Sequence, residues 1–190
     1  MTRIVLPGEP LVEDATALRP WRDSDAAAVT RACRDPEIAR WTRVPENYSE
    51  SDARAFLLHR YDALLAGTTA PFAVVSPQDR LLGSVALMRM DWDHRRGEAG
   101  YWLAPEARGR GHATRALRLV CAWGFAALGL ERVNLYAATG NRASQRVAER
   151  AGFSREGVLR AYMRGKEGQY DMVAYGLLAD HLGREDPAPG

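Results

Sequence analysis

The stretch APEARGRGHATRAL, residues 104–117, carries three arginines and two glycines directly before a segment with helical periodicity. The first turn of a helix presents unpaired backbone N–H groups and a partial positive charge, and both attract anions. Gly109 and Gly111 have no Cβ, so a ligand can approach their backbone closely. Arg108 and Arg110 can add charge-assisted hydrogen bonds. The stretch therefore predicts a cradle for a phosphate or pyrophosphate group.

Other phosphate-binding glycine motifs do not fit this stretch. A P-loop requires GxxxxGK[ST], and no lysine is present here. The dinucleotide fingerprint GxGxxG would need a glycine at the position of Thr114. The composition also argues against a nucleic-acid-binding surface, because the net charge is only +2 and acidic residues are interleaved with the arginines. The spacing that remains is Arg-x-x-Gly-x-Ala, formed by Arg108, Gly111 and Ala113.

This spacing resembles the acyl-CoA-binding signature (Q/R)xxGx(G/A) of the GCN5-related N-acetyltransferases, the GNAT superfamily. The flanking sequence resembles the branch that acetylates the N-termini of ribosomal proteins, the RimJ/RimL-like enzymes. The similar segments span residues 17–182 and are LRPWRDSDAAAV, DPEIARW, GEAGYWLAPEARGRGHATRAL, NRASQRVAERAGF and REGVLRAYMRGKEGQYDMVAYGLLAD. The resemblance implies an acyltransferase with the GNAT fold, a mixed α/β domain whose central, mostly antiparallel sheet has splayed strands and flanking helices.

The resemblance also implies a co-substrate, acetyl-CoA, and the residues that would hold it. In the family, backbone amides of the loop and helix start hold the CoA pyrophosphate, and the preceding strand pairs with the pantetheine arm. The acyl thioester is then expected between Tyr101–Leu103 and the strand Val133–Ala138. The expected CoA contacts are Trp102, Leu103, Arg108, Gly109, Arg110, Gly111, His112, Ala113, Thr114 and Asn141, with the His112 ring toward phosphate or solvent. For the glycines alone, an ordinary turn between a strand and a helix is the competing interpretation.

Acetyl transfer to an amine needs a base for the amine proton, a donor for the oxyanion and a proton for the leaving thiolate. Glu98, within GEAGYW, matches a glutamate of the RimJ/RimL-like branch and is the base that we expect, acting through water. A charged residue on a partly exposed strand is the competing interpretation. The weaker candidates for the base are Asp171, Tyr162 and Tyr136.

The proton donor for the thiolate is less clearly marked. Many GNAT enzymes place a tyrosine seven residues after the asparagine that opens the last helix, but that position here is Ala148. The RimJ/RimL-like branch offers a serine three residues after the asparagine, which makes Ser144 the candidate acid. An equally simple interpretation is that Asn141 caps a helix and Ser144 is its third residue.

The acceptor amine arrives as a cation, which suits aromatic faces and a carboxylate. Candidate acceptor-site residues, each of which could instead belong to the core, are Trp41, Tyr48, Trp92, Tyr162 and Asp171. We expect an N-acetyltransferase in which the amine attacks acetyl-CoA directly in a ternary complex, with a protein or peptide N-terminus as acceptor. The alternatives are a small amine such as an antibiotic or metabolite, a succinyl-CoA donor, or a non-catalytic acyl-CoA-binding module.

The elements that must position these residues follow from hydrophobic periodicity, caps and turns. Strands are predicted at 16–21, 71–76, 81–91, 97–104, 131–139, 153–164 and 170–180, and helices at 22–35, 49–67, 112–128 and 141–152, with a turn and a short helix in DPEIARWT. We expect an N-terminal arm over residues 1–15, one domain over 16–182 and a flexible tail over 183–190.

Composition sets the remaining expectations. The 46% of apolar residues is ordinary for a globular domain, and no apolar run reaches the roughly 20 residues that span a bilayer. The N-terminal residues do not have the pattern of a secretory signal, so we expect a soluble cytoplasmic protein. Two isolated cysteines and four scattered histidines predict no metal site and no disulfide framework. The resemblance makes a homodimer possible.

Overall fold

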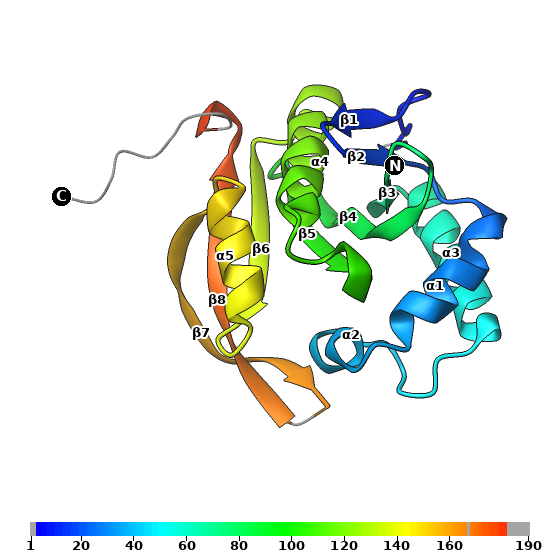
Figure 1. The fold of residues 1–190 in the computed structure, drawn as a ribbon. Coiled ribbons are helices and arrows are strands. Elements are labelled where there is room, and N and C mark those ends of the chain that lie inside the picture. Colours follow the sequence, from blue (N-terminus) through cyan, green and yellow to red (C-terminus); the bar gives the residue numbers. More distant parts are fainter. Residues whose placement is uncertain (1–2, 167, 182–190) are drawn as a thin grey trace.

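An eight-stranded mixed sheet runs through the molecule, and helices cover both of its faces (Figure 1). The computed structural model describes residues 3–166 and 168–181. The strands are β1 (Leu11–Glu13), β2 (Thr16–Arg19), β3 (Thr69–Val75), β4 (Leu81–Asp91), β5 (Arg96–Leu103), β6 (Arg132–Ala138), β7 (Ser154–Gly165) and β8 (Gly168–Leu178). The α-helices are α1 (Ala26–Cys33), α2 (Pro36–Trp41), α3 (Glu50–Leu65), α4 (His112–Leu128) and α5 (Arg142–Arg150), and the 3-10 helices are η1 (Asp23–Asp25), η2 (Pro105–Ala107) and η3 (Ala179–His181).

The predicted elements agree with the structure apart from one or two residues at most ends. The helix expected over residues 22–35 differs more, because its first turn is the 3-10 helix η1. There the Asp25 carboxylate accepts a hydrogen bond from the backbone N–H of Arg22, at 2.9 Å, and a bidentate pair from the buried Arg19 guanidinium. The side chain of Asp25 thus holds the start of this segment against the end of β2.

The N-terminal segment is part of the sheet, which corrects the expectation of an arm over residues 1–15. Its residues Leu11–Glu13 form β1, which pairs antiparallel with β2. Ile4, only 5% exposed, packs into the core. A strand of three residues is too short for its alternation to be recognised in a sequence. The tail expected over residues 183–190 lies outside the described residues.

Two hydrophobic clusters pack against opposite faces of the sheet. On β3, Phe72 and Val74 belong to the cluster that includes the α4 residues Leu117 and Val120. The intervening residue Ala73 belongs to the cluster that α1 and α3 complete. Successive residues of a strand point to opposite faces, so β3 contributes to both clusters. The sheet is therefore a rigid central layer on which the loops between strands and helices are held.

The sheet opens between β5 and β6. The strand order is β1-β2-β3-β4-β5-β6-β8-β7, and these two neighbours alone run parallel among the strands described. They are paired only from Arg96↔Arg132 to Glu98↔Asn134. Beyond Glu98, β5 continues to Leu103 paired with β4 alone, and β6 continues to Ala138 paired with β8 alone. The splayed sheet is confirmed, and the two halves diverge in Figure 1.

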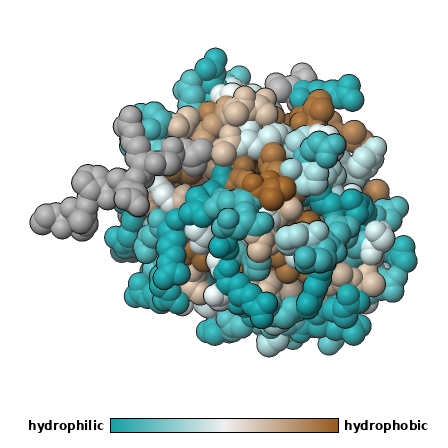
Figure 2. Space-filling view, turned by 45° about the horizontal axis from the view of Figure 1, so that its top comes forward, coloured by the Kyte–Doolittle hydropathy of each residue, from teal (hydrophilic) through white to brown (hydrophobic). Residues whose placement is uncertain are grey.

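Figure 2 shows one face of the molecule, on which hydrophilic side chains predominate and hydrophobic ones occupy small areas. The mixed character of this surface agrees with a net charge of +2 made from 26 basic and 24 acidic residues. None of the described helices combines the length and the apolar character that a membrane span requires.

Candidate active site

The predicted cradle lies where β5 and η2 lead into α4. Gly109 and Gly111 both have a left-handed backbone, with φ of +75° and +78°, a conformation that glycine adopts at little cost. Gly111 is the N-cap of α4, and no side chain caps this helix end. The first-turn N–H groups of α4 therefore keep their capacity to bind an anion. The geometry fits the phosphate cradle that the sequence predicts.

The three arginines of this loop have different surroundings. Arg108 donates to the Asp35 carboxylate and to the Leu103 carbonyl, so its guanidinium ties the end of β5 to the start of α2. Arg115 donates to Asp14 and to the carbonyl of Arg110. Arg110 itself is exposed and forms no ion pair with any described residue. The side chain of Arg110 is thus the one available to an anion, whereas that of Arg108 is engaged within the fold.

The His112 side chain does not face the cradle, which corrects the expectation of a ring toward phosphate or solvent. It is only 7% exposed, and its Nδ1 lies 2.8 Å from the Thr16 Oγ1 on β2. Burial lowers the pKa of His112, and the charges of Arg115 and Arg110 lower it further. His112 therefore anchors α4 to the sheet, and its backbone N–H alone remains for a ligand.

Glu98 lies at the point where the sheet opens, since it forms the last pairing of β5 with β6. Its side chain is 15% exposed, and the Arg89 guanidinium donates to it at 2.8 Å. Arg89 has φ of +52° and lies where the register of β4 shifts, between Met88 and Asp91. Burial raises the pKa of Glu98, and Arg89 opposes that effect. The contribution of Arg89 was not predicted, because a bulge inside a strand leaves no sequence signal here.

Tyr136 is close enough to Glu98 to feel its charge, and the Tyr136 ring packs against Tyr162. The Tyr136 and Tyr162 rings are 5.1 Å apart between centroids, and Tyr162 is 47% exposed. Burial raises the pKa of Tyr136 most. The neighbouring Tyr162 and the negative charge of Glu98 raise it further. The Asp171 carboxylate accepts the backbone N–H of Ala161 at 2.7 Å, where the register of β7 shifts. Asp171 thus holds the strand beside Tyr162, whose ring contacts that of Tyr136.

The candidate acid lies on the other face of β5. The Tyr101 hydroxyl donates to the Oγ of Ser144, at 3.1 Å. The Asn141 side chain caps α5 by accepting the Ser144 backbone N–H at 3.0 Å, so the cap does not use the Ser144 hydroxyl. Burial raises the pKa of Tyr101 to about 12, although the bond to Ser144 opposes this. The sequence places Tyr101 on a strand facing away from Glu98, but its pairing with Ser144 needs the tertiary structure.

The remaining predicted acceptor residues are scattered. Trp41 lies on α2 with its ring 6.0 Å from that of Tyr170, and its Nε1 donates to Glu37. Tyr48 is 5% exposed and packs in the cluster beneath α1 and α3. Trp92 follows β4, and its Nε1 donates to the carbonyl of Gly67 at 3.2 Å. The structure brings neither Tyr48 nor Trp92 to Glu98, because both are packed against the core.

Comparison with known proteins connects this geometry to a family. A model described as "Acetyltransferase (GNAT) domain" matches residues 16–154. Uncharacterized N-acetyltransferase YoaA of Bacillus subtilis is 31% identical over 172 residues, 89% of this chain and 97% of that protein. A second B. subtilis protein, "Putative ribosomal N-acetyltransferase YdaF", is 32% identical over 83% of this chain and 86% of its own length. Spermidine N(1)-acetyltransferase of Escherichia coli is 29% identical over 75% of this chain and 74% of its own.

A solved structure shares the fold. Mycobacterium smegmatis RimJ in complex with CoA-disulfide superposes with a TM-score of 0.82 at 24% identity, over 90% of this chain and 85% of that one. At this identity the similarity concerns the architecture, including the mixed sheet and its flanking helices.

Proposed function

The chain belongs to the GNAT family of acetyltransferases, and on this premise we propose that it transfers an acetyl group from acetyl-CoA to the N-terminal amine of a protein or peptide. One observation carries the proposal. Glu98, a half-buried carboxylate, and the hydroxyl pair of Tyr101 and Ser144 lie on opposite faces of β5 where the sheet opens. A base and an acid are thus available on the two sides of the same opening.

The described residues fit acetyl-CoA. The backbone of residues 109–114 would hold the pyrophosphate, with the side chain of Arg110 as an added cation. Beyond Glu98 the edge of β5 that faces β6 is not paired with another strand, so Trp102 and Leu103 can pair with the pantetheine arm. When bound, the co-substrate supplies an activated acyl group as a thioester. RimJ of M. smegmatis binds CoA in the same fold, which supports this placement.

Two side chains then take part in the two proton transfers: Glu98 at the amine and Ser144 at the thiolate. Glu98 accepts a proton from the acceptor ammonium, directly or through water, which exposes the nitrogen lone pair for attack. Arg89 keeps the Glu98 carboxylate oriented and favours its ionised form. Ser144 accepts a hydrogen bond from Tyr101, so its own hydroxyl proton can point toward the leaving thiolate. The amine attacks within a ternary complex, and no enzyme nucleophile is needed.

The charges near the site favour an N-terminal amine over a polyamine. Glu98 is a single carboxylate beside Arg89, which suits one ammonium group. The exposed residues of β7 include Arg155, Arg160 and Arg164, which would repel a polycation. The name of YdaF, a ribosomal N-acetyltransferase, agrees with this choice, and the E. coli spermidine enzyme represents the competing acceptor.

The test is release of free CoA thiol from acetyl-CoA in the presence of matched amines. We expect release with peptides that have a free N-terminus and none with the same peptides acetylated at the N-terminus. Spermidine as the better acceptor would refute the proposed acceptor. Thermal stabilisation by acetyl-CoA without release for any amine would indicate a binding module; a ligand at 100 times its Kd stabilises by about 2.7 kcal/mol. Replacing acetyl-CoA by succinyl-CoA in the same assay tests the donor.

A further inference from the structure

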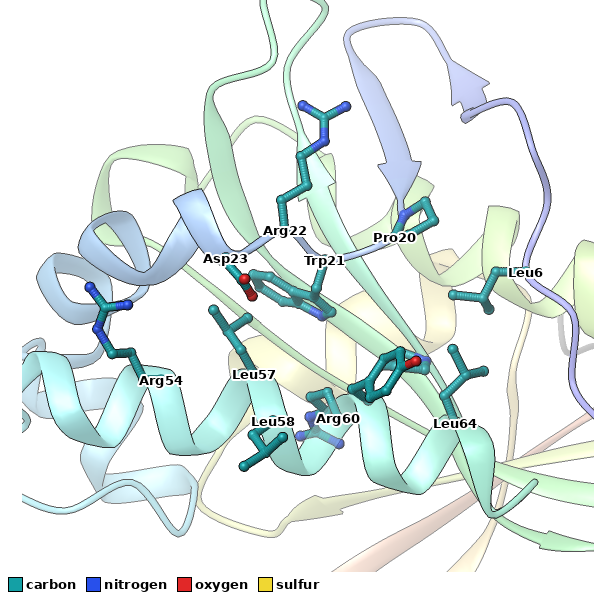
Figure 3. A pocket seen from close by; sticks show the side chains of 12 residues that line it. Leu6, Pro20, Trp21, Arg22, Asp23, Arg54, Leu57, Leu58, Arg60 and Leu64 are labelled. Carbon is teal, nitrogen blue, oxygen red and sulfur yellow. The ribbon is translucent and has the colours of Figure 1, made fainter.

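A cavity of about 580 Å³ lies between α3 and the chain that leaves β2 (Figure 3). Figure 3 shows Trp21 and Pro20 on that chain, and Leu57, Arg60 and Leu64 projecting from α3. None of the residues that line this cavity belongs to the cradle, to the group around Glu98 or to the Tyr101–Ser144 pair. The cavity is therefore separate from the proposed site of acetyl transfer.

The wall of this cavity contains a cation without a counter-charge. The Arg60 Nε is enclosed and has no hydrogen-bond acceptor, and no described residue forms an ion pair with its guanidinium. Its guanidinium carbon lies 4.8 Å from the centre of the Phe56 ring. Burial lowers the pKa of Arg60, and the electrostatic effect of Tyr48 opposes this shift. A partly buried charge without a counter-charge is unfavourable, and an anion in the cavity that contacts the guanidinium would relieve that cost.

A second donor on this wall also has no acceptor. The Trp21 Nε1 is enclosed without a hydrogen-bond partner, and its ring packs edge-on against Phe56 with centroids 5.4 Å apart. Trp21 and Arg60 thus flank the same phenyl ring. Neither of these two donors has an acceptor within the protein, which indicates a ligand that accepts hydrogen bonds.

The other charged residues of the lining do not compensate Arg60. Arg54 is paired with Glu50 at 2.6 Å, and Arg22 is paired with Asp79 at 2.5 Å. Asp23 lines the cavity but forms no ion pair with Arg60. The remainder of the lining is largely apolar and includes Leu6, Pro20, Leu57, Leu64 and Pro71.

We propose that this cavity binds a small monocarboxylate with an apolar body, whose carboxylate contacts the terminal nitrogens of Arg60 and whose body packs on the leucines. The cavity volume of about 580 Å³ is within the range of small-molecule sites, about 300–1,000 Å³. Rotation of the Trp21 ring would supply a second donor to the same carboxylate. The site is independent of acetyl transfer, and its occupation does not require a bound acyl donor.

The test compares octanoate, octanol and octylamine as probes, by isothermal titration of the full chain. We expect octanoate to bind, and octanol and octylamine to bind at least about tenfold more weakly, because only the carboxylate pairs with Arg60. Equal binding of octanol would overturn the proposal by showing that the cavity selects apolar bodies alone. Absence of octanoate binding would overturn it directly.

Two variants locate the site. Arg60→Met should weaken octanoate at least about tenfold while the protein stays folded, since the change removes an uncompensated charge and keeps an apolar stem. Arg54→Met is the matched control, because Arg54 lines the same cavity from the same helix but is paired with Glu50; it should bind octanoate as the parent does. Octanoate binding unchanged in Arg60→Met contradicts the proposal.

The exposed Leu58 and Tyr61 at this cavity make a second copy of the chain the competing occupant. Sedimentation tests this alternative: a dimer that excludes octanoate would also overturn the proposal.

Discussion

The Tyr101 hydroxyl donates a hydrogen bond to the Oγ of Ser144 at 3.1 Å, and so connects β5 with the first turn of α5 across the opened sheet. Tyr101 lies on a strand, and Ser144 lies in the first turn of a helix. Together they place two hydroxyl groups on the face of β5 opposite to Glu98. Because Ser144 is the acceptor in this bond, its own proton is directed elsewhere, and in the proposed reaction it goes to the thiolate.

We expect Ser144→Ala and Tyr101→Phe to lower kcat by at least about tenfold, a loss typical of removing one proton-transfer partner. Each should leave the affinity for CoA nearly unchanged, because the cradle is elsewhere. The measurement is thiol release at saturating acetyl-CoA and peptide, with CoA affinity from thermal shifts. If Ser144 is only a helix residue, kcat will not change.

The control for helix stability is Asn141. Its side chain accepts the Ser144 backbone N–H at 3.0 Å, so Asn141→Ala removes the cap and should cost about 1 kcal/mol of unfolding free energy. Asn141→Asp retains a capping oxygen and should restore most of it. Ser144→Ala keeps the capped N–H, so its kinetic effect should appear without a comparable loss of stability. The reverse pattern would assign Ser144 a structural role.

Glu98→Gln should lower kcat by about 100-fold, since it removes the base but keeps the shape of the side chain. Thermal stabilisation by acetyl-CoA should persist. The pKa of Glu98 is raised by burial, so the carboxylate is protonated, and activity falls, at a higher pH than for an ordinary glutamate. The acidic limb of kcat/KM against pH reports this titration in the free enzyme. An unchanged rate in Glu98→Gln would exclude Glu98 as the base.

Arg89 should control the position of that acidic limb. It opposes the rise in the pKa of Glu98, so Arg89→Met should move the limb to higher pH. Arg89→Lys retains a positive charge and should move it less. The contrast between the two variants separates an electrostatic effect from damage to the β4 bulge, where Arg89 has φ of +52°. If the acidic limb of kcat/KM lies at the same pH in both variants and in the parent, Arg89 does not act on Glu98.

Most of the fold could be predicted from the sequence, because periodicity and glycine spacing are local signals. The strand Gly97–Ala104 and the helix His112–Leu128 were predicted nearly as they occur, and the two left-handed glycines between them were marked by their lack of a Cβ. The partners of the charged side chains were not predictable in this way. That Arg108 meets Asp35, and that His112 meets Thr16 across 96 residues, depends on how the sheet and helices pack. A basic residue beside a glycine loop looks the same in sequence whether it faces a ligand or the core.

The two ends of α4 provide a matched test of the cradle. Gly111 and Gly129 have similar left-handed backbones, with φ of +78° and +65°. Alanine at either position should cost about 1–2 kcal/mol of stability through backbone strain. Only Gly111→Ala should also weaken CoA binding, because its Cβ would lie 2.7 Å from the Arg115 Nη1 and would force a shift within the loop proposed as the cradle, and Gly111→Trp should abolish binding. CoA affinities equal in both alanine variants would place the cradle elsewhere.

His112 should make the stability of the fold depend on pH. Its pKa is lowered in the folded state, mainly by burial, so the unfolded chain binds a proton at higher pH than the folded chain does. The stabilisation by neutral His112 is therefore fully present above the unfolded pKa of about 6.5 and is lost as the pH falls toward the folded pKa. Urea unfolding of the parent should give a midpoint that decreases between about pH 7 and pH 5. His112→Gln, which can still hydrogen-bond Thr16, should flatten this decrease, whereas His59→Gln on the exposed face of α3 should not. A parent and a His112→Gln variant with the same pH dependence would assign the effect to other groups.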